Sequence, residues 1–314
     1  MSIEMPLESA SLTQLQQIPI DDVLNIIDEG LVHLPSYREL FYRWERQHWL
    51  AQEIDFTPDR LQWEAMSPQG HQDRMYGLSA FFKGEACVTD TLGPYITAMP
   101  DEEMRIFLTT QLSDEARHTV FFARFFREVL GVERDTLEDT LEVTHDYMNA
   151  QLQYLLMDAL SEVAERIRQE PRNIAHLVEG ITLYHVIVEG TLALTGQRNI
   201  LDFYRQNNLF PAFRGGFTAV TRDESRHVVF GVKFLREMVQ RDAANAKVIQ
   251  AAVDKYAPVA IQALTREDEY IPQMLARQVD PWTAPRYAQD SLRKKLKVVG
   301  LSMELPYVPP PPVF

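Results

Sequence analysis

Two stretches of the chain carry nearly the same sequence: residues 114–130 read DEARHTVFFARFFREVL and residues 223–239 read DESRHVVFGVKFLREMV. The copies are identical at nine of seventeen positions, without a gap, and start 109 residues apart. Each contains a Glu-x-x-His motif, which is Glu115 with His118 and Glu224 with His227. Residues three apart lie on one face of an α-helix, about one turn from each other. The two side chains of each motif can therefore bind the same ion.

Each copy follows an apolar segment that contains a single glutamate. Glu85 lies in SAFFKGEACVTD, and Glu189 lies in LYHVIVEGTLAL. The sequence therefore predicts two helix pairs built on one plan. One Glu from each of two helices, with one Glu-x-x-His from each of the other two, is the ligand set of ferritin-like dinuclear carboxylate proteins. The sequence predicts an all-α, ferritin-like four-helix bundle with additional helices and a dinuclear metal site inside the bundle.

The predicted metal ligands are six residues with a balanced charge. Four carboxylates offset the four positive charges of two divalent ions, and hard oxygen ligands with two imidazoles suit iron or manganese better than zinc or copper. Burying these carboxylates in apolar flanks without a cation would be costly. The ligands in chain order are Glu85, Glu115, His118, Glu189, Glu224 and His227.

Glu-x-x-His alone is a weak signal, because the chain holds two further copies of it. These are Glu45 with His48, in a basic and aromatic segment, and Glu142 with His145, in an acidic amphipathic segment. Neither of these two motifs belongs to a repeated segment. We therefore interpret both as solvated helix faces.

Asp114 and Asp223 directly precede the two repeated glutamates. Metal-bound histidines usually donate their second ring N–H to a carboxylate, so each aspartate is a candidate to orient the histidine of the other copy from outside the ligand set. The alternative is an ordinary aspartate on a helix surface.

The pattern of apolar residues predicts helices throughout the interior. Long helices are expected over 67–99, 100–130, 171–196 and from residue 211 or 215 to 240, and shorter ones over 21–29, 37–51, 135–169 (broken), 247–275 and 288–298. Four consecutive prolines near the C-terminus indicate an extended tail. We expect an N-terminal extension at 1–40, one helical domain at 41–298 and the proline-rich tail at 299–314.

Composition excludes several classes of protein. The 314 residues carry a formal charge of −14, which disfavours binding to nucleic acid. The longest stretch without Asp, Glu, Lys or Arg has twelve residues, fewer than the roughly 20 that a membrane span needs. An acidic N-terminus and a single cysteine, Cys87, indicate neither a secretory signal nor a disulfide framework. We expect a cytoplasmic protein without a transmembrane segment.

Over about residues 40–260, the six-ligand pattern resembles the ribonucleotide reductase small-subunit superfamily, and more closely its branch of ligand-binding oxidases. Phe122 stands four residues after His118, where ordinary reductase small subunits carry a radical-storing tyrosine. The segment YHVIVEGTLALTG is similar to a motif of the branch, with Tyr184 five residues before Glu189. GEACVTD places Val88 three residues after Glu85.

The resemblance implies a manganese-iron or di-iron centre, with Glu85, Glu115 and His118 on manganese and Glu189, Glu224 and His227 on iron. It also implies a long-chain fatty acid whose carboxylate touches the metals, a homodimer, and an ether crosslink between Val88 and Tyr184 formed when the metals react with oxygen. Val88 lies one turn after Glu85 and faces the same way. Tyr184 is about 140° away from Glu189 on an ideal α-helix, so its place at the metals rests on the resemblance.

Three functions compete at this point. The first is an oxidoreductase that uses O2 at the dinuclear centre to oxidise a C–H bond of an apolar carboxylate. The second is a reductase small subunit that stores its oxidising equivalent in a manganese-iron pair, which needs a tail that docks on a large subunit; here the tail offers Tyr307. The third is an iron store on a ferritin-like bundle. The sequence favours the first.

Overall fold

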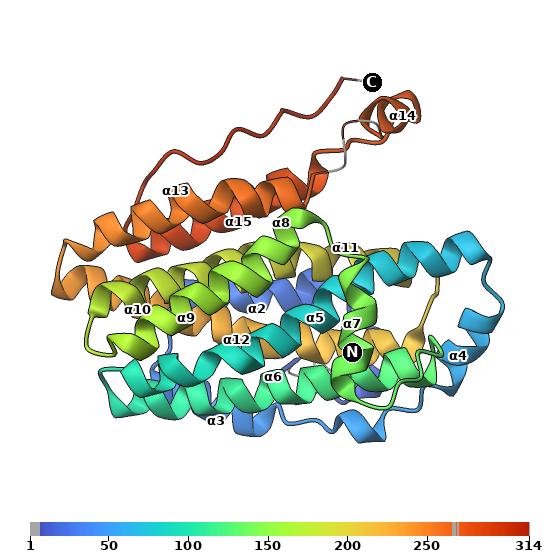
Figure 1. Cartoon of the computed structure of the whole chain (residues 1–314), viewed down its shortest axis with the longest axis horizontal. Coiled ribbons are helices and arrows are strands. Elements are labelled where there is room, and N and C mark those ends of the chain that lie inside the picture. The colour runs from blue at the N-terminus through green and yellow to red at the C-terminus, as the bar shows by residue number, and fades with distance from the viewer. Residues whose placement is uncertain (1–6, 266–267, 269, 314) are drawn as a thin grey trace, which may run out of the picture.

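The computed structural model describes residues 7–265, 268 and 270–313, and these form helices and connecting segments with no strand. Four long helical runs make the bundle (Figure 1). They are α5 (Pro68–Ala98), α6 (Glu102–Glu128), the continuous run of α10 (Ile174–Ile181), η4 (Thr182–Ala193) and α11 (Leu194–Gln206), and α12 (Pro211–Arg241). The predicted all-α, ferritin-like bundle is confirmed. The third run continues ten residues beyond the predicted end at Gly196, because Gly196 is accommodated within the helix against Phe81.

Local sequence signals explain where the long helices begin. The Ser67 hydroxyl accepts the backbone N–H of Gly70 at 3.2 Å, and Asp101 accepts that of Glu103 at 2.9 Å. These are ordinary N-caps. Phe210, the residue before α12, has a left-handed backbone conformation with φ 43°. Its side chain forms no capping hydrogen bond to the helix. Buried Asp59 instead accepts the N–H groups of Ala212 at 3.0 Å and Phe213 at 2.6 Å.

Asp59 belongs to a helix that the sequence did not predict, α4 (Thr57–Glu64), which begins with Pro58 in its first turn. The remaining N-terminal elements are α1 (Leu12–Leu15), α2 (Ile20–His33) and α3 (Tyr37–Arg46), with 3-10 turns at η1 (Leu7–Ser9) and η2 (Ala51–Glu53). Helices α1 and α2 pack on α12, and α3 packs on α6. The predicted helix over 37–51 ends early, at Arg46. The predicted domain limits stay a prediction.

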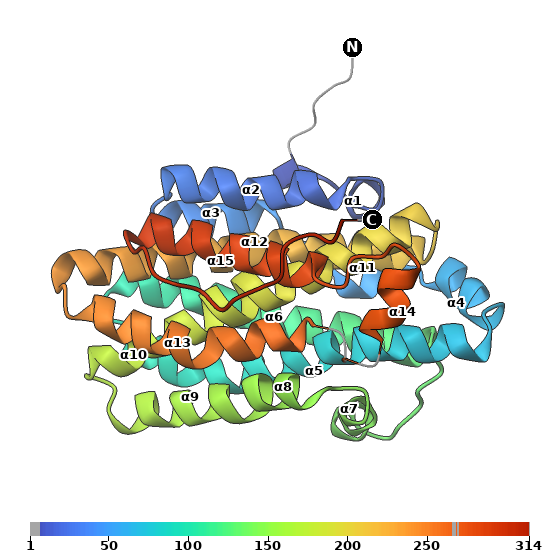
Figure 2. The same cartoon turned by 90° about the horizontal axis from the view of Figure 1, so that it is seen from above.

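The peripheral helices cover two sides of the bundle. Helix α7 (Leu137–His145) and the run of α8 (Ala150–Gln153), η3 (Tyr154–Ala159) and α9 (Leu160–Gln169) lie over α5, opposite α2 and α3 (Figure 2). Helices α13 (Asn245–Ala263) and α15 (Thr283–Val299) cover η4 and α12. The expected single helix over 247–275 is wrong, since α13 ends at Ala263 and α14 (Ile271–Ala276) starts separately with Pro272 in its first turn.

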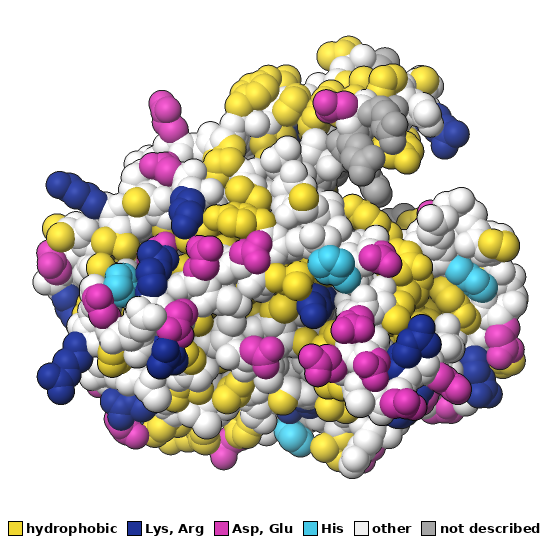
Figure 3. All heavy atoms as spheres, viewed as in Figure 1, with side chains coloured by type: hydrophobic (Ala, Val, Ile, Leu, Met, Phe, Trp, Pro, Cys, Tyr) yellow, Lys and Arg dark blue, Asp and Glu magenta, His cyan; other side chains and the backbone are white. Residues whose placement is uncertain are grey.

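The C-terminal tail is extended from Leu301 to Val313, as its prolines predict. Two side chains of α15 hold it, since Arg286 donates to the carbonyl of Pro309 at 2.7 Å and Gln289 donates to that of Pro306 at 2.5 Å. On the face in Figure 3, acidic and basic side chains of the described residues are interspersed along the helices. That face therefore carries no continuous band of one charge.

One helical run, Ile174–Gln206, is long and apolar enough to cross a membrane by length and composition. In the structure, 89% of its most apolar window is buried inside the protein. It also contains Glu189, which lies in the bundle interior. Its apolar character is thus used in packing the core, as is usual for a central helix of a helical bundle.

Candidate metal centre

The six predicted ligands converge in the middle of the bundle. Glu85 comes from α5, Glu115 and His118 from α6, Glu189 from η4, and Glu224 and His227 from α12. All six side chains are buried, with at most 7% of any residue exposed. Ligand atoms within 4.8 Å of one another form two groups of four that share Glu115 and Glu224. The groups are Glu85, Glu115, His118 and Glu224, and Glu115, Glu189, Glu224 and His227.

Both histidines present Nδ1 to the carboxylates. Nδ1 of His118 lies 3.2 Å from Oε2 of Glu85 and 3.5 Å from Oε2 of Glu115. Nδ1 of His227 lies 3.2 Å from Oε2 of Glu224 and 3.5 Å from Oε1 of Glu189. This arrangement gives each half of the cluster one imidazole nitrogen and several carboxylate oxygens, which is a donor set for iron or manganese.

The electrostatics of the cluster also fit a pair of cations. Burial raises the pKa of Glu85 and of Glu189 well above their usual range, and neighbouring carboxylates add to the effect. One oxygen, Oε2 of Glu189, is buried without a hydrogen-bond partner among the described residues. An unpaired buried carboxylate oxygen is costly. Two divalent ions would stabilise the ionised carboxylates and occupy this oxygen, so the residues fit a dinuclear metal site.

Each histidine uses its other nitrogen for an aspartate of the opposite copy. Nε2 of His118 lies 3.2 Å from Oδ2 of Asp223, and Nε2 of His227 lies 3.1 Å from Oδ2 of Asp114. Both aspartates are fully buried. The alternative interpretation of Asp114 and Asp223 as surface residues is wrong, and their crosswise placement beside the histidines is the one that the repeat predicts.

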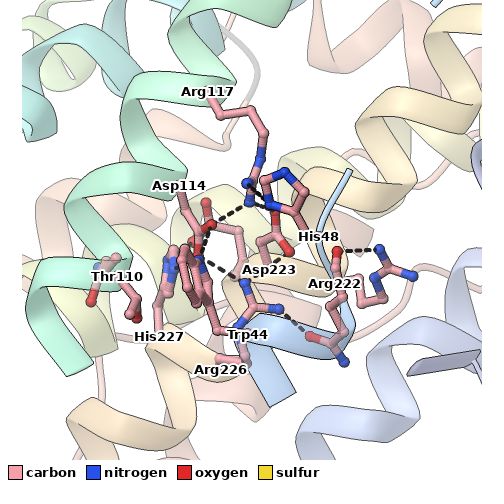
Figure 4. Close-up of polar contacts among 12 residues, drawn as sticks. Trp44, His48, Thr110, Asp114, Arg117, Arg222, Asp223, Arg226 and His227 are labelled. Atoms are coloured by element: carbon pink, nitrogen blue, oxygen red, sulfur yellow. Dashed lines mark hydrogen bonds and ion pairs between the residues drawn. The ribbon is translucent and has the colours of Figure 1, made fainter. Parts of the chain in front are cut away.

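Two arginines from equivalent positions of the repeat bridge the aspartates (Figure 4). Arg226 donates to Asp114 and to Asp223, both at 2.8 Å. Arg117 donates to Asp223 at 3.0 Å and also to Asp114. Although burial acts in the opposite direction, Arg226, His118 and Arg117 lower the pKa of Asp223 well below its usual range. These contacts keep a negative charge on Asp223, behind His118.

Two tryptophans also contact the aspartates, and no sequence pattern predicted either of them. The indole N–H of Trp44 donates to Asp114 at 2.9 Å, and that of Trp49 donates to Asp223 at 2.8 Å. They come from the segment that contains Glu45 and His48. Those two residues are exposed, as are Glu142 and His145 on α7, so neither additional Glu-x-x-His motif belongs to the cluster.

The π-helical form of η4 brings Tyr184 to the cluster. In this segment the N–H of Leu194 donates to the carbonyl of Glu189, five residues earlier, in place of the four of an α-helix. Residues five apart therefore lie on the same side, and the hydroxyl of buried Tyr184 donates to Oε1 of Glu115 at 2.9 Å. The 140° offset expected for an ideal α-helix does not apply here.

Gln111 and His185 lie beside the cluster, although no sequence pattern predicted them. Gln111 is buried on α6 and places its Nε2 2.9 Å from Oε1 of Glu189, 3.2 Å from Oη of Tyr184 and 3.4 Å from Oε1 of Glu115. Its Oε1 lies 3.0 Å from Nε2 of His185. The repeat could not reveal Gln111, because the equivalent position of the second copy is Val220.

Val88 and Phe122 are both buried. The Phe122 ring packs among phenylalanines, with ring centroids 5.2 Å from Phe121 and 5.6 Å from Phe217. Two further rings, Phe81 and Phe82, stack on it at 6.3 Å and 6.2 Å. Phe122, four residues after His118, therefore lies in a cluster of apolar aromatic rings.

This architecture is similar to that of known proteins, in sequence and in structure. The family model described as "Ribonucleotide reductase, small chain" matches residues 33–285. Among solved structures, the chain is similar to R2-like ligand-binding oxidase. A valine-to-leucine variant with an anaerobically reconstituted Mn/Fe cofactor is 23% identical, with a TM-score of 0.73 over 84% of this chain and 93% of that one. A tyrosine-to-phenylalanine variant with an aerobically reconstituted Mn/Fe cofactor is 22% identical, with a TM-score of 0.72 over the same shares.

Proposed function

Because the chain belongs to the ribonucleotide reductase small-chain family, we propose that it is an oxygen-activating oxidase with a dinuclear centre of manganese and iron, or of two irons. The observation that carries this proposal is the buried cluster of four glutamates and two histidines with the phenol of Tyr184 against it. When bound, the metals supply O2 activation and Lewis acidity. The similar solved structures hold a Mn/Fe cofactor, which supports the choice of metals.

The proposed ligands are Glu85, Glu115 and His118 for manganese and Glu189, Glu224 and His227 for iron. Glu115 and Glu224 belong to both groups of ligand atoms, so each could contribute to holding either ion. Asp114 and Asp223 act behind the ligands, since each accepts a hydrogen bond from a histidine and fixes its ring orientation.

The proposed substrate is a long-chain fatty acid or a similar apolar carboxylate. The cluster lies in an interior rich in phenylalanine, which favours an apolar chain, and open metal positions would favour a carboxylate head. Two surface pockets of about 650 and 480 Å³ contain no cluster residue, so neither is assigned to this ligand. Mass spectrometry of an organic extract of the denatured protein tests the proposal. A stoichiometric polar metabolite in place of a lipid would contradict it.

We also propose the ether crosslink between Val88 and Tyr184. The Cβ–H bond of Val88 and the O–H bond of Tyr184 would break and a C–O bond would form, which releases two protons and two electrons. O2, activated by the metals that the six ligands would hold, would accept both protons and both electrons and become hydrogen peroxide. The Val88 Cβ–H is tertiary, which makes it a weak aliphatic bond. The Tyr184 hydroxyl already donates to Glu115, which is placed to receive its proton.

Tryptic digestion tests the crosslink. Protein loaded with metals and exposed to O2 should release residues 84–105 joined to residues 173–198, lighter by two hydrogens than the two separate peptides. Anaerobic protein and the Tyr184→Phe variant should release them separately. If the aerobic parent with a full dinuclear site also gives separate peptides, the ligand-binding oxidase proposal loses its most specific support.

The second candidate is a small subunit of ribonucleotide reductase that keeps its oxidising equivalent in the metals. The description of the matching family favours it. The aromatic cluster around Phe122 supplies no phenol at the position of the radical-storing tyrosine. Nucleotide reduction in the presence of a large subunit distinguishes this function from an oxidase. Metal analysis distinguishes both from an iron store, which would hold many ions per chain.

We propose a cytoplasmic homodimer that associates through the exposed face of α6. Val120 is 50% exposed and Ile106 44%, and the α6 positions between them on this face, Thr109, Ser113 and Ala116, are uncharged. Sedimentation tests this, because Val120→Asp would place a charge in the interface and release monomers. A monomeric parent would contradict the proposal.

A further inference from the structure

The carboxamide of Gln111 lies between the cluster and a buried histidine. Its Nε2 faces three oxygen atoms, from Glu189, Tyr184 and Glu115, at 2.9, 3.2 and 3.4 Å. Its Oε1 faces Nε2 of His185 at 3.0 Å. All of these side chains are buried, with Gln111 and His185 fully inaccessible to solvent. One amide thus contacts two proposed metal ligands and the tyrosine of the proposed crosslink.

The orientation of this amide follows from its neighbours. If the amide were turned over, its oxygen would face two carboxylates and a phenol oxygen, which is repulsive in a site of low dielectric constant. The nitrogen must therefore face the cluster, and the amide oxygen must accept a hydrogen bond from His185. His185 carries its proton on Nε2, since its Nδ1 has no partner among the described residues.

The amide then sets the direction of the Tyr184 hydroxyl. The two N–H groups of the Gln111 amide donate hydrogen bonds to the two nearest oxygens, those of Glu189 and Tyr184. Because the phenol oxygen accepts from Gln111, its own proton is directed to Oε1 of Glu115 at 2.9 Å. The lone pair that would form the ether bond is held in one place by this pair of hydrogen bonds.

We infer that Gln111, fixed by His185, is the positioning residue that orients the Tyr184 phenol and the Glu189 carboxylate for the oxidative reaction at the cluster. This inference rests on the proposed function and adds to it two residues outside the ligand set.

The second copy of the repeat makes room for this arrangement. Gly231 occupies the position equivalent to Phe122, and a Cβ atom added there would lie 2.2 Å from Cβ of His185. His185 therefore fills the space that a side chain takes in the first copy. Burial lowers the pKa of His185 well below its usual range, and the nearby His227 adds to the effect. The imidazole is neutral and keeps a single N–H for Gln111.

The first test measures crosslink formation after O2 is added to anaerobic protein loaded with manganese and iron. In Gln111→Leu, all six ligands remain, so metal content should stay near two ions per chain. The rate of crosslink formation should fall about 10- to 100-fold, since small misplacements of reacting groups cost this much. Gln197→Leu is the matched control, because Gln197 is another buried glutamine, on α11, and makes no hydrogen bond to the cluster among the described residues.

His185→Phe provides a second variant that leaves Gln111 and every ligand in place. It removes the N–H that fixes the amide, so the crosslink rate should fall by about 10-fold. This variant decides the inference if Gln111→Leu loses metal. Parent-like rates in both variants, with two metals bound, would overturn the positioning role.

The second test does not depend on the crosslink. Protein containing 3-fluorotyrosine is loaded with diamagnetic zinc, and the 19F resonance of Tyr184 is assigned with Tyr184→Phe. Gln111→Leu and His185→Phe should shift or split this resonance, whereas Gln197→Leu should leave it in place. If the parent never forms the crosslink but these shifts occur, the proposed function fails and the positioning role stands. An unchanged resonance in both variants overturns the positioning role itself.

Discussion

Asp114 and His227 come from opposite copies of the internal repeat, and Oδ2 of Asp114 lies 3.1 Å from Nε2 of His227. Asp223 and His118 repeat the relationship at 3.2 Å. Each copy therefore supplies the carboxylate that the histidine of the other copy needs, so neither half completes a metal site alone.

Replacing Asp114 by Asn should weaken metal binding about 10- to 100-fold, as for other carboxylates that orient a ligand histidine. The change keeps the shape of the side chain but removes the charge that favours the Nε2–H form of His227. Competition with a chelator measures the affinity. Asp146→Asn, an exposed aspartate of the C-cap of α7, is the control. Equal affinities in the two variants would contradict this role of Asp114.

Ligand variants should differ in how many ions they lose. Glu115 contributes to both groups of ligand atoms, whereas His227 contributes to one. Metal analysis should therefore show loss of both ions in Glu115→Ala and of about one in His227→Ala, because the remaining carboxylates repel one another without the cation. The double variant Glu142→Ala/His145→Ala should keep two ions. Loss of metal in that control would show that the wrong Glu-x-x-His pair was chosen.

Asp59 should make the stability of the protein fall between about pH 4 and pH 6. Burial raises the pKa of this carboxyl to about 6, above the value of about 3.9 in an unfolded chain. In this interval the folded state binds the proton more tightly, so the free energy of unfolding decreases as pH rises, by about 3 kcal/mol in total. Urea unfolding at several pH values should show this decrease in the free energy of unfolding in the parent and not in Asp59→Asn. Parallel profiles would refute it.

Lys295 should make the stability of the protein depend on pH in the alkaline range. Burial lowers the pKa of Lys295 to about 7, and among the described residues its ammonium group donates hydrogen bonds only to Ser291, to Oγ at 2.5 Å and to the carbonyl at 3.3 Å. The unfolded chain binds the proton more tightly between about pH 7 and pH 10.5, so stability should rise with pH there, by up to about 5 kcal/mol. Lys295→Met should flatten the profile, whereas exposed Lys294→Met should not. A Lys295→Met profile as steep as the parent's would be the contrary result.

Gly231→Ala should destabilise the fold, whereas Gly77→Ala should not. The methyl group added at Gly231 would meet Cβ of His185 at 2.2 Å, and that atom cannot move without the backbone of η4. Overpacking of this kind costs about 1–3 kcal/mol. At Gly77 the nearest atom, Cδ1 of Ile200, is 3.6 Å away, so Ala should add about 0.5–1 kcal/mol through its helix propensity. Thermal denaturation compares the two.

The sequence predicted the bundle and the cluster because both are encoded in short, regular patterns. The repeat places Glu115, His118, Glu224 and His227 by spacing alone, and the crosswise aspartates follow from its symmetry. Helix limits were less well predicted where tertiary contacts decide them. Helix α4 has Pro58 in its first turn, and Asp59 within it caps α12 from 153 residues away in the chain, a relationship that no local pattern contains.

The residues around Tyr184 could not be predicted for a different reason. Gln111 has no counterpart in the second copy, and Trp44 and Trp49 lie in a segment whose charged residues indicated solvent exposure. Their hydrogen bonds depend on how distant helices pack. The position of Tyr184 itself depends on the hydrogen-bonding register of η4, which composition does not specify.

That register changes how related sequences must be aligned. A π-helical segment is an α-helix that has absorbed one additional residue as a wider turn. Deleting one residue between Tyr184 and Glu189 would leave the tyrosine four residues before the glutamate, and four residues in an α-helix again place both side chains on one side. A spacing of five in one chain and of four in another can thus describe the same three-dimensional neighbour. Against a chain with the spacing of four, an alignment that forbids a gap at this point would pair this tyrosine with the wrong residue.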